Sequence, residues 1–559
     1  MKIGRNQACS CGSGKKYKRC CGDPLKAQGQ QQSRVEKVPL SVLDAIPRME
    51  AREHIRKQQQ GLGRPIVSWE DRRHRIVAVG NTVHFSPRWK VFTDFLEDYI
   101  KKVMGSEWGT AEMAKPAEQR HPLMKWFDGY VAFKQQVTEK TGELYSAPAS
   151  GVVYCYLGLA YNLYLISHNV ELQDRLVRRL RDPHNFQGAY YELIVANCLI
   201  RAGFKLELED EADNDTKHCE FSAVSTLSGR KYWVEAKMRS VAGLLGKDIR
   251  DGATSDHDPS KKITEHVAMA FQKPAADERL IFVDVNGPPA TESVLPRWAE
   301  RAADRLDARE KDTPDHQAAY VFVTNFAFHR SLDAVGPNHA ALAYGLNIPD
   351  FAKPGEYRLI DMYRAKQKHL DAYRIMDAIR DYPKLPTTFD GSLLSDAIVD
   401  GRPRIEIGRR YFFEDIEEKG ILATVTTATV LEKEKKVYIG VTTEDGRNLI
   451  LTESMTDAQL TDYRAHPDAY FGVIRRVSRN SKDAFDLFEW MVESYKKTPK
   501  QRLIELAKGA PDLARLAELD RDSLALELCE RWTASFAMQN SNAAAASGLV
   551  IESTSTEAS

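Results

Sequence analysis

No stretch of the 559-residue chain is apolar over the roughly 20 residues that a membrane-spanning helix needs. The nearest candidate, GVVYCYLGLAYNLYLISH (151–168), lacks charge but contains four tyrosines, an asparagine and a serine. Tyr and Leu recur there at helical spacing, so we expect a buried helix. The first residues, MKIGRNQACSCG, contain no apolar stretch and therefore do not form a secretory signal. We expect a cytoplasmic protein with no membrane partner.

The chain also lacks an excess of charge of either sign, with 79 Lys and Arg residues against 79 Asp and Glu. Overall electrostatics therefore do not indicate binding to nucleic acid. The charge is unevenly spread, however, because residues 1–37 hold nine basic residues against two acids. We expect this first segment to present a basic surface.

Cysteine is scarce outside one cluster. Of eight cysteines, four lie within thirteen residues near the N-terminus, and the others are scattered at positions 155, 198, 219 and 529. This distribution does not resemble the framework of a disulfide-rich domain. It is typical of a cytoplasmic chain with one metal-binding cluster.

The clustered cysteines follow the pattern Cys9-x-Cys11, then eight residues, then Cys20-Cys21. Zinc binds four such ligands as a tetrahedron, and two close pairs joined by a short loop can supply them. The segment is too small to fold by hydrophobic burial, so metal binding would provide its folding energy. Two disulfides or loose redox thiols are the alternative.

The residues GRNQACSCGSGKKYKRCCG (4–22) resemble the SEC-C motif, which occurs at the C-terminus of the preprotein-translocase motor ATPase and at the ends of many unrelated bacterial proteins. The resemblance implies that Cys9, Cys11, Cys20 and Cys21 bind a structural Zn²⁺. It also implies docking to a protein partner, either an export chaperone or the ribosome.

Composition and periodicity divide the chain into a multidomain α+β protein. The expected parts are a zinc knuckle (1–24), a linker (25–40), a mainly helical domain (41–180), an α/β core with a mixed central sheet (181–335), a helical connector (336–402), a small β module (403–475), C-terminal helices (476–538) and a disordered tail (539–559).

The core pattern runs helix, three strands, helix, strand, helix, strand. Its last two strands, RLIFVDV and AYVFVTN, are apolar throughout, as expected for a sheet that is buried on both faces. The expected helices are 186–202, 261–272 and 291–308, and the expected strands are 204–209, 218–226, 231–237, 279–285 and 319–325.

Within this core, Glu235-Ala236-Lys237 ends a central strand. Residues i and i+2 of a strand share a face, so Glu235 and Lys237 project together. Glu220 lies on the preceding strand of the expected hairpin, and Glu192 lies in the apolar helix before it. Similar Glu-x-Lys triplets at 417–419 and 434–436 occur in charged, surface-like stretches and carry no such context.

Two carboxylates on adjacent strands can hold a hard divalent cation, which prefers oxygen ligands. Glu220, Glu235 and the Ala236 carbonyl would bind Mg²⁺ or Mn²⁺, while Lys237 would position or deprotonate the attacking water. Glu192 would complete the site through a second metal, a water molecule or Lys237.

This arrangement resembles the PD-(D/E)XK phosphodiesterase superfamily, over about residues 186–325. The resemblance implies a restriction-endonuclease-like core with catalytic Glu192, Glu220, Glu235 and Lys237. The chain departs from the usual pattern in one position, since Glu220 follows Cys219 where the family commonly has Asp, often after Pro.

A purely structural interpretation stays open for each of these residues. Glu235 and Lys237 could form an edge-strand ion pair, and Glu192 could be a solvated helix residue. Glu192 nevertheless stands among Tyr190, Tyr191 and Leu193, where a charge is costly without a partner.

Several neighbours have two interpretations as well. His218, Arg239 and Lys247 could contact phosphate or be structural or solvated residues. Gln272 would be a surface residue at a helix end, and Cys198 a packed thiol.

The sequence therefore predicts a metal-dependent nuclease that acts on DNA or RNA, with an accessory zinc-binding docking motif. Defence of a bacterial cell against foreign DNA would suit such a protein by analogy. The alternative is a non-catalytic adaptor, in which a nuclease-like scaffold binds nucleic acid, a chaperone or a ribosomal partner.

Overall fold

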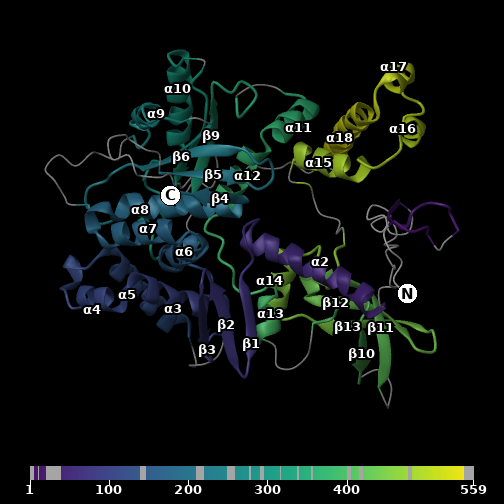
Figure 1. Cartoon of the computed structure of the whole chain (residues 1–559), viewed down its shortest axis with the longest axis horizontal. Coiled ribbons are helices and arrows are strands. Elements are labelled where there is room, and N and C mark those ends of the chain that lie inside the picture. The colour runs from purple at the N-terminus through teal and green to yellow at the C-terminus, as the bar shows by residue number, and fades with distance from the viewer. Residues whose placement is uncertain are drawn as a thin grey trace.

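The computed structural model describes residues 6–9, 12–19, 40–138, 147–208, 220–247, 258–275, 278–289, 295–314, 316–336, 339–353, 357–398, 404–414, 420–475, 481 and 483–546 (Figure 1). Side chains are described from residue 45 in the first long helix and up to residue 536 in the last. Over these residues the protein is a multidomain α+β structure with one mixed and two antiparallel sheets.

The mixed sheet has six strands in the order β4-β5-β6-β7-β8-β9. β6, β7 and β8 run parallel to one another, whereas the outer pairs are antiparallel. The strand bounds are β4 Phe204–Glu207, β5 Phe221–Ser225, β6 Lys231–Met238, β7 Glu278–Asp284, β8 Ala319–Asn325 and β9 Ala340–Leu346.

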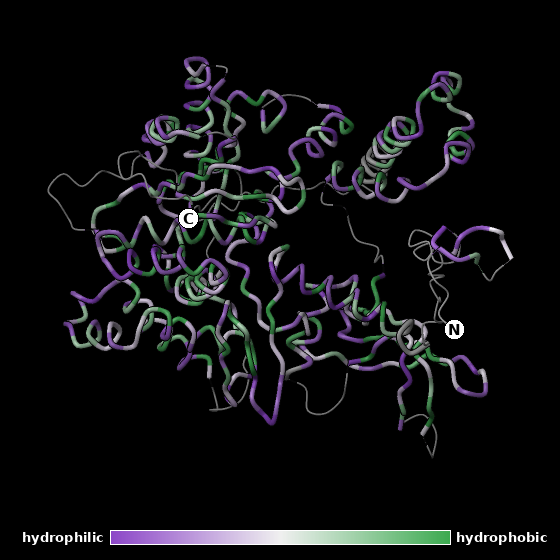
Figure 2. The backbone as a smooth tube through the Cα atoms, in the orientation of Figure 1, coloured by the Kyte–Doolittle hydropathy of each residue, from purple (hydrophilic) through white to green (hydrophobic). Residues whose placement is uncertain are grey.

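Helices cover both faces of this sheet (Figure 1). α8 (Pro183–Arg201) packs on one face, and α9 (Ile263–Phe271) and α10 (Arg297–Lys311) pack on the other. Alternate residues of β7 serve the two cores, since Phe282 joins the α8 side while Ile281 joins the α9 and α10 side. This explains why the strand is apolar throughout. In Figure 2, α10 is largely hydrophilic and the strands beneath it are more hydrophobic.

The core on the α8 side extends into the N-terminal helices. α6 (Gly151–Leu165) is buried along nearly its whole length and contacts α3, α5 and α8, which confirms the buried helix expected there. In the described ranges, no helix is both long and apolar enough to cross a membrane. The bounds are α3 Phe92–Met104, α4 Ser106–Met113, α5 Pro122–Val137 and α7 Val170–Arg181.

A three-stranded antiparallel sheet precedes these helices, formed by β1 (Val67–Asp71), β2 (His74–Val79) and β3 (Thr82–Ser86). β2 and β3 form a hairpin around Gly80. β1 was not expected, because its turn is made by Arg72 and Arg73, both with positive φ, where Asn-Gly is the usual signal.

The small β module is a four-stranded antiparallel sheet, as expected from its alternating pattern. Its core also receives Ala51 and Ile55 from α2 (Leu40–Gln60), which lies against the sheet in Figure 1. The bounds are β10 Arg410–Phe413, β11 Ile421–Leu431, β12 Lys436–Thr443, β13 Asn448–Ser454, α13 Leu394–Ile398 and α14 Asp457–Ala465.

The remaining helices form the C-terminal layer and its connection to the sheet. α18 continues to Ala546, which corrects the expectation that disorder begins at 539. The bounds are α11 Leu359–Lys368, α12 Leu370–Asp381, α15 Ala484–Tyr495, α16 Lys500–Leu506, α17 Leu513–Glu518 and α18 Arg521–Ala546.

The element order expected for 186–325 is confirmed as α8-β4-β5-β6-α9-β7-α10-β8. One correction concerns the segment after it. Residues 340–346 were expected in a helical connector, but they form β9 at the edge of the mixed sheet. The run AALAYGL alternates too weakly to predict a strand, and its pairing with β8 supplies what the local pattern does not.

Candidate active site

The β5–β6 hairpin brings Glu220 and Glu235 together. Phe221 pairs with Val234, and the Glu220 amide donates to the Val234 carbonyl at 3.1 Å, so Glu220 precedes β5 directly beside Glu235. The turn between the strands closes through Gly229, whose positive φ of 72° suits glycine. The expected hairpin therefore positions the two carboxylates.

Alternation along β6 decides which side chains share the site. Val234 and Ala236 face the core on the α8 side. Glu235 and Lys237 therefore face the opposite side, where α9 lies. The Glu235 side chain is only 3% exposed, so its charge requires partners.

Lys237 joins the two carboxylates. Its Nζ lies 2.8 Å from Glu220 Oε1 and 2.7 Å from Glu235 Oε1. Both carboxylates thus converge on a single ammonium group. This is the convergence of Glu220 and Glu235 near Lys237 that the sequence predicts.

A second lysine, Lys273, was not predicted. It follows the end of α9, and its Nζ lies 2.8 Å from Glu235 Oε1, 2.7 Å from Oε2 and 3.9 Å from Glu220 Oε1. Its neighbour Gln272 is exposed, as expected for a surface residue at the helix end. A lysine after a helix has no local signature, so only the tertiary contact identifies it.

Glu192 is buried on α8 and pairs with Arg179 of α7. The guanidinium donates from Nη1 to Oε2 at 2.5 Å and from Nη2 to Oε1 at 2.7 Å. This two-pronged geometry is the strongest form of Arg–carboxylate pairing. The direct partner of Glu192 is therefore Arg179, which the sequence analysis missed among the several arginines of α7.

The pKa values of Glu192 and Glu220 are shifted in opposite directions. Burial, followed by the negative charge of Glu220, raises the pKa of Glu192 to about 6 against the opposing effect of Arg179. Burial would also raise the pKa of Glu220, but Lys237, Lys273 and Arg179 outweigh it and lower that pKa. Glu220 is therefore held ionised.

Lys237 is held in its charged form. Burial opposes its charge, but Glu220 and Glu235 together raise its pKa above the ordinary lysine value. In this arrangement Lys237 is therefore a cation that donates hydrogen bonds to the carboxylates.

His266 of α9 lies within electrostatic reach of Lys237. Both ring nitrogens are buried, and neither has a hydrogen-bond partner within the described ranges. Burial, and next the charge of Lys237, lower its pKa, so the ring is neutral. An unsatisfied buried polar group costs about 1–3 kcal/mol. Among the described residues, His266 therefore offers an unused hydrogen-bonding group within electrostatic reach of Lys237.

The residues fit one divalent cation rather than a fully preformed cage. Among the described residues, no group of three or more His, Cys, Asp and Glu side chains comes together for a metal. Mg²⁺ typically keeps several waters and binds through one or two carboxylates together with substrate phosphate. Glu220 and Glu235, which already converge on ammonium groups, match that donor set.

Other candidates from the sequence have structural roles. Arg239 is buried and donates to the Val285 and Asn286 carbonyls, and Lys247 donates to the His184 carbonyl. Cys198 is a buried thiol on α8. Residues 218 and 219 lie outside the described residues.

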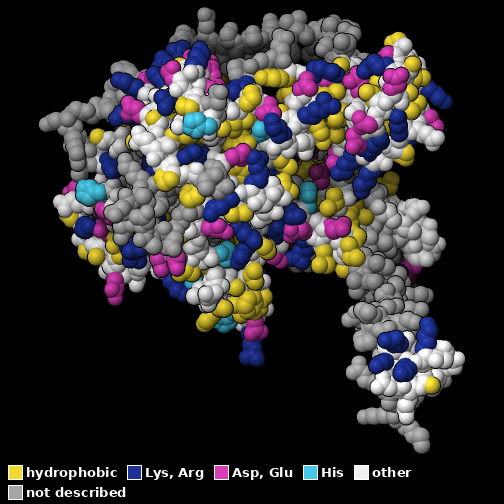
Figure 3. Space-filling view, turned by 45° about the horizontal axis from the view of Figure 1, so that its top comes forward, with side chains coloured by type: hydrophobic (Ala, Val, Ile, Leu, Met, Phe, Trp, Pro, Cys, Tyr) yellow, Lys and Arg dark blue, Asp and Glu magenta, His cyan; other side chains and the backbone are white. Residues whose placement is uncertain are grey.

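The described part of the N-terminal segment folds back on itself. Ala8 bridges to Lys16, and the Cys9 amide donates to the Lys15 carbonyl at 2.9 Å. Cys9 is buried, whereas the lysines around the turn are exposed, as Figure 3 shows on the small lobe at the lower right. Positions 11, 20 and 21 lie outside the described residues, so the expected zinc ligand set is incomplete here.

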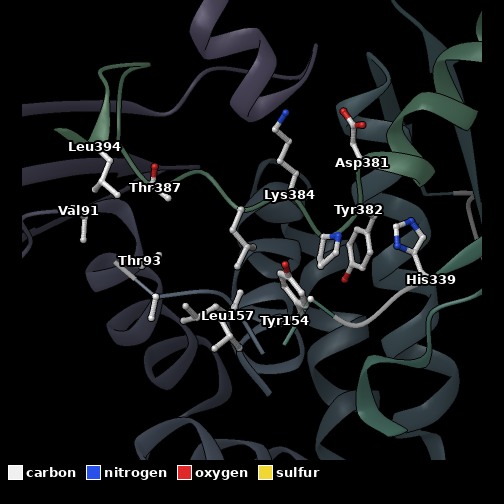
Figure 4. A pocket seen from close by; sticks show the side chains of 16 residues that line it. Val91, Thr93, Tyr154, Leu157, His339, Asp381, Tyr382, Lys384, Thr387 and Leu394 are labelled. Carbon is white, nitrogen blue, oxygen red and sulfur yellow. The ribbon is translucent and has the colours of Figure 1, made fainter. Parts of the chain in front are cut away.

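A cavity of about 540 Å³ lies elsewhere, between α3, α6 and the segment after α12 (Figure 4). Its polar walls include His339, Asp381 and Tyr382. The Tyr382 hydroxyl accepts from Asn162, and His339 pairs with the Ile379 carbonyl. The charged cluster on β6 is the better candidate for chemistry, because it combines two buried carboxylates with two lysine cations.

Comparison with known proteins finds similarity only at the N-terminus. The SEC-C motif matches residues 5–23. Over 21 residues the chain is 86% identical to "Protein translocase subunit SecA 1" of Magnetococcus marinus. Over 21 residues it is 81% identical to "UPF0225 protein GSU1048" of Geobacter sulfurreducens. These matches cover 4% of this chain and 2% and 13% of the two relatives. No solved structure matches the chain. The chain therefore carries a SEC-C motif at residues 5–23.

Proposed function

We propose that this protein is a metal-dependent nuclease that hydrolyses phosphodiesters at the Glu220, Glu235 and Lys237 cluster. The observation that carries the proposal is the convergence of both carboxylates on Lys237 at 2.8 and 2.7 Å, on a Glu-x-Lys strand. The order of helices and strands around that strand supports it as well, since it follows the PD-(D/E)XK pattern.

The residues of this site would have separate roles in phosphodiester hydrolysis. A divalent cation bound by Glu220 and Glu235, with the Ala236 carbonyl as a further oxygen ligand, would supply Lewis-acid polarisation of the phosphodiester. Lys237, held as a cation, orients the attacking water and offsets negative charge on the phosphate. His266, within electrostatic reach of Lys237, provides a hydrogen-bonding group that has no partner among the described residues. Arg179 and Glu192 fix α7 against α8, and the charges of both act on Glu220.

The proposal is tested with plasmid, single-stranded DNA and RNA, each incubated with Mg²⁺, Mn²⁺ or EDTA. Cutting by the wild-type protein should require metal and be lost in Glu235→Gln and Lys237→Met. Glu434→Gln and Lys436→Met are matched controls, because that Glu-x-Lys pair is solvent-exposed with a 3.8 Å separation. Cutting that survives both site variants would reject the proposal.

A second candidate function is a scaffold that binds nucleic acid without cutting it. One observation favours it. The charges of three carboxylates are balanced by three cations without a metal, and these groups are Glu192, Glu220, Glu235, Arg179, Lys237 and Lys273. Clean wild-type protein that binds oligonucleotides but cuts none of them under any metal condition would support this candidate.

For the N-terminal segment we propose a zinc-bound docking module with Cys9, Cys11, Cys20 and Cys21 as ligands. The motif match and the hairpin that buries Cys9 support it. The translocase relative shares this segment, and an export chaperone or the ribosome is the kind of partner proposed. Pull-down from lysate with wild-type protein and Cys20→Ser tests whether partner capture depends on the zinc ligands.

A further inference from the structure

Lys273 stands where the proposed catalytic cation would bind. Its ammonium contacts both Glu235 oxygens at 2.7 and 2.8 Å, and it lies 3.9 Å from Glu220 Oε1. The Lys273 side chain is 15% exposed, which is half the exposure of Lys237 at 32%. Of the two lysines, Lys273 is the more buried and contacts both oxygens of Glu235, whereas Lys237 bridges the two carboxylates.

The Glu235 carboxylate is fully engaged by ammonium groups. Oε1 contacts both Lys237 and Lys273, and Oε2 contacts Lys273. Mg²⁺ binds carboxylate oxygens at about 2.0–2.1 Å. A divalent cation at that distance and an ammonium on the same oxygens would repel each other strongly in a buried site. A divalent cation that binds Glu235 Oε2 therefore competes with Lys273, whose ammonium contacts that oxygen at 2.7 Å.

The side chain of Lys273 can leave without a change of fold. Its backbone is fixed, because Arg279 Nη2 donates to the Lys273 carbonyl at 2.9 Å. The ammonium is carried on a flexible four-carbon stem after the end of α9. Displacement therefore requires only a rotamer change, and the backbone around β6 stays in place.

We propose that Lys273 is a resident counter-ion of the metal position, which a divalent cation must displace to bind Glu220 and Glu235. In the metal-free protein Lys273 offsets the negative charge of the two carboxylates where they converge. Its displacement leaves a site with net positive charge, which suits an anionic phosphodiester. Lys273 thus sets the metal affinity of the site. This inference rests on the proposed function, because it takes Glu220 and Glu235 as metal ligands.

The test is calorimetric titration of zinc-loaded protein with Mn²⁺ alone, without nucleic acid. Lys273→Met should bind Mn²⁺ about tenfold more tightly than wild type, because the competing charge is gone. Lys353→Met is the matched control, since Lys353 is similarly buried and pairs with Glu310 at 2.6 Å elsewhere. The Glu220→Gln/Glu235→Gln double variant gives the background.

Each outcome decides a different claim. Equal or weaker Mn²⁺ binding by Lys273→Met, with wild type binding above background, overturns the inference and leaves the proposed nuclease intact. Absence of binding above background in both proteins rejects the metal site itself and the inference with it. Lys273→Gln, which keeps a polar side chain, is measured in parallel, and circular dichroism of each variant confirms folding.

Discussion

Arg179 and Glu192 form a two-pronged ion pair between α7 and α8, with distances of 2.5 and 2.7 Å. The Glu192 side chain is 6% exposed and the Arg179 side chain 29%. The pair therefore compensates the charge of a carboxylate that is buried among Tyr and Leu side chains.

Removal of the arginine alone should destabilise the protein. Arg179→Met leaves Glu192 buried without its partner, and we expect a loss of about 2–3 kcal/mol in the free energy of unfolding, allowing for the partial exposure of Arg179. Urea denaturation measures this loss. Arg178→Met, on the exposed side of the same helix, should change stability by less than about 0.5 kcal/mol.

The double variant Arg179→Met/Glu192→Gln separates charge from packing. If the unpaired charge causes the loss, neutralising Glu192 should recover part of it. A double variant less stable than Arg179→Met would contradict this explanation.

The contribution of Glu220 to stability should depend on pH. Its pKa in the folded state is lowered from 4.5, so its ionised form is favoured by folding. The stabilisation is present above pH 4.5 and is lost as pH falls through the lowered value. The difference in unfolding free energy between wild type and Glu220→Gln should therefore shrink below pH 4.5. If this difference in unfolding free energy grew as the pH fell, it would contradict a lowered pKa of Glu220 in the folded protein.

Replacement of His266 should raise the stability of the protein and lower its cleavage activity. His266→Leu removes two buried nitrogens that lack partners among the described residues, and we expect the free energy of unfolding to rise by about 1 kcal/mol. The same change should weaken cleavage, because the unused hydrogen-bonding group beside Lys237 is gone. Thermal unfolding and a cleavage assay measure the two effects, and unchanged cleavage would make His266 a structural residue only.

Zinc removal should act locally. Purified protein should contain about one zinc per chain, and Cys20→Ser should lose it. The β module and the mixed sheet have their own hydrophobic cores, so a chelator should leave their thermal transition unchanged. Zinc-free protein with a folded N-terminal segment would contradict the metal-binding proposal.

Periodicity predicted what lies within one element or one hairpin. The two-residue period placed Glu235 and Lys237 on one face of β6, and the hairpin placed Glu220 beside them. The uncharged stretch at 151–165 was recognised as a buried helix from its Tyr and Leu spacing.

Contacts between distant elements left no such pattern. Lys273 reaches Glu235 across 38 positions, and Arg179 is one of several arginines on an amphipathic helix. Neither has a local feature that distinguishes it from a solvated residue. β1 was hidden because Arg72 and Arg73 form its turn with positive φ, against the usual residue preference.

The most direct measurement is the single-turnover cleavage rate of an end-labelled oligonucleotide in Mn²⁺. The rate for Glu235→Gln should fall at least about a hundredfold below wild type, because the variant loses both a metal ligand and the partner of Lys237. The rate for Glu434→Gln should equal that of wild type. Equal rates for wild type and Glu235→Gln, or no metal-dependent cleavage by wild type, would contradict the assignment of this cluster as a nuclease site.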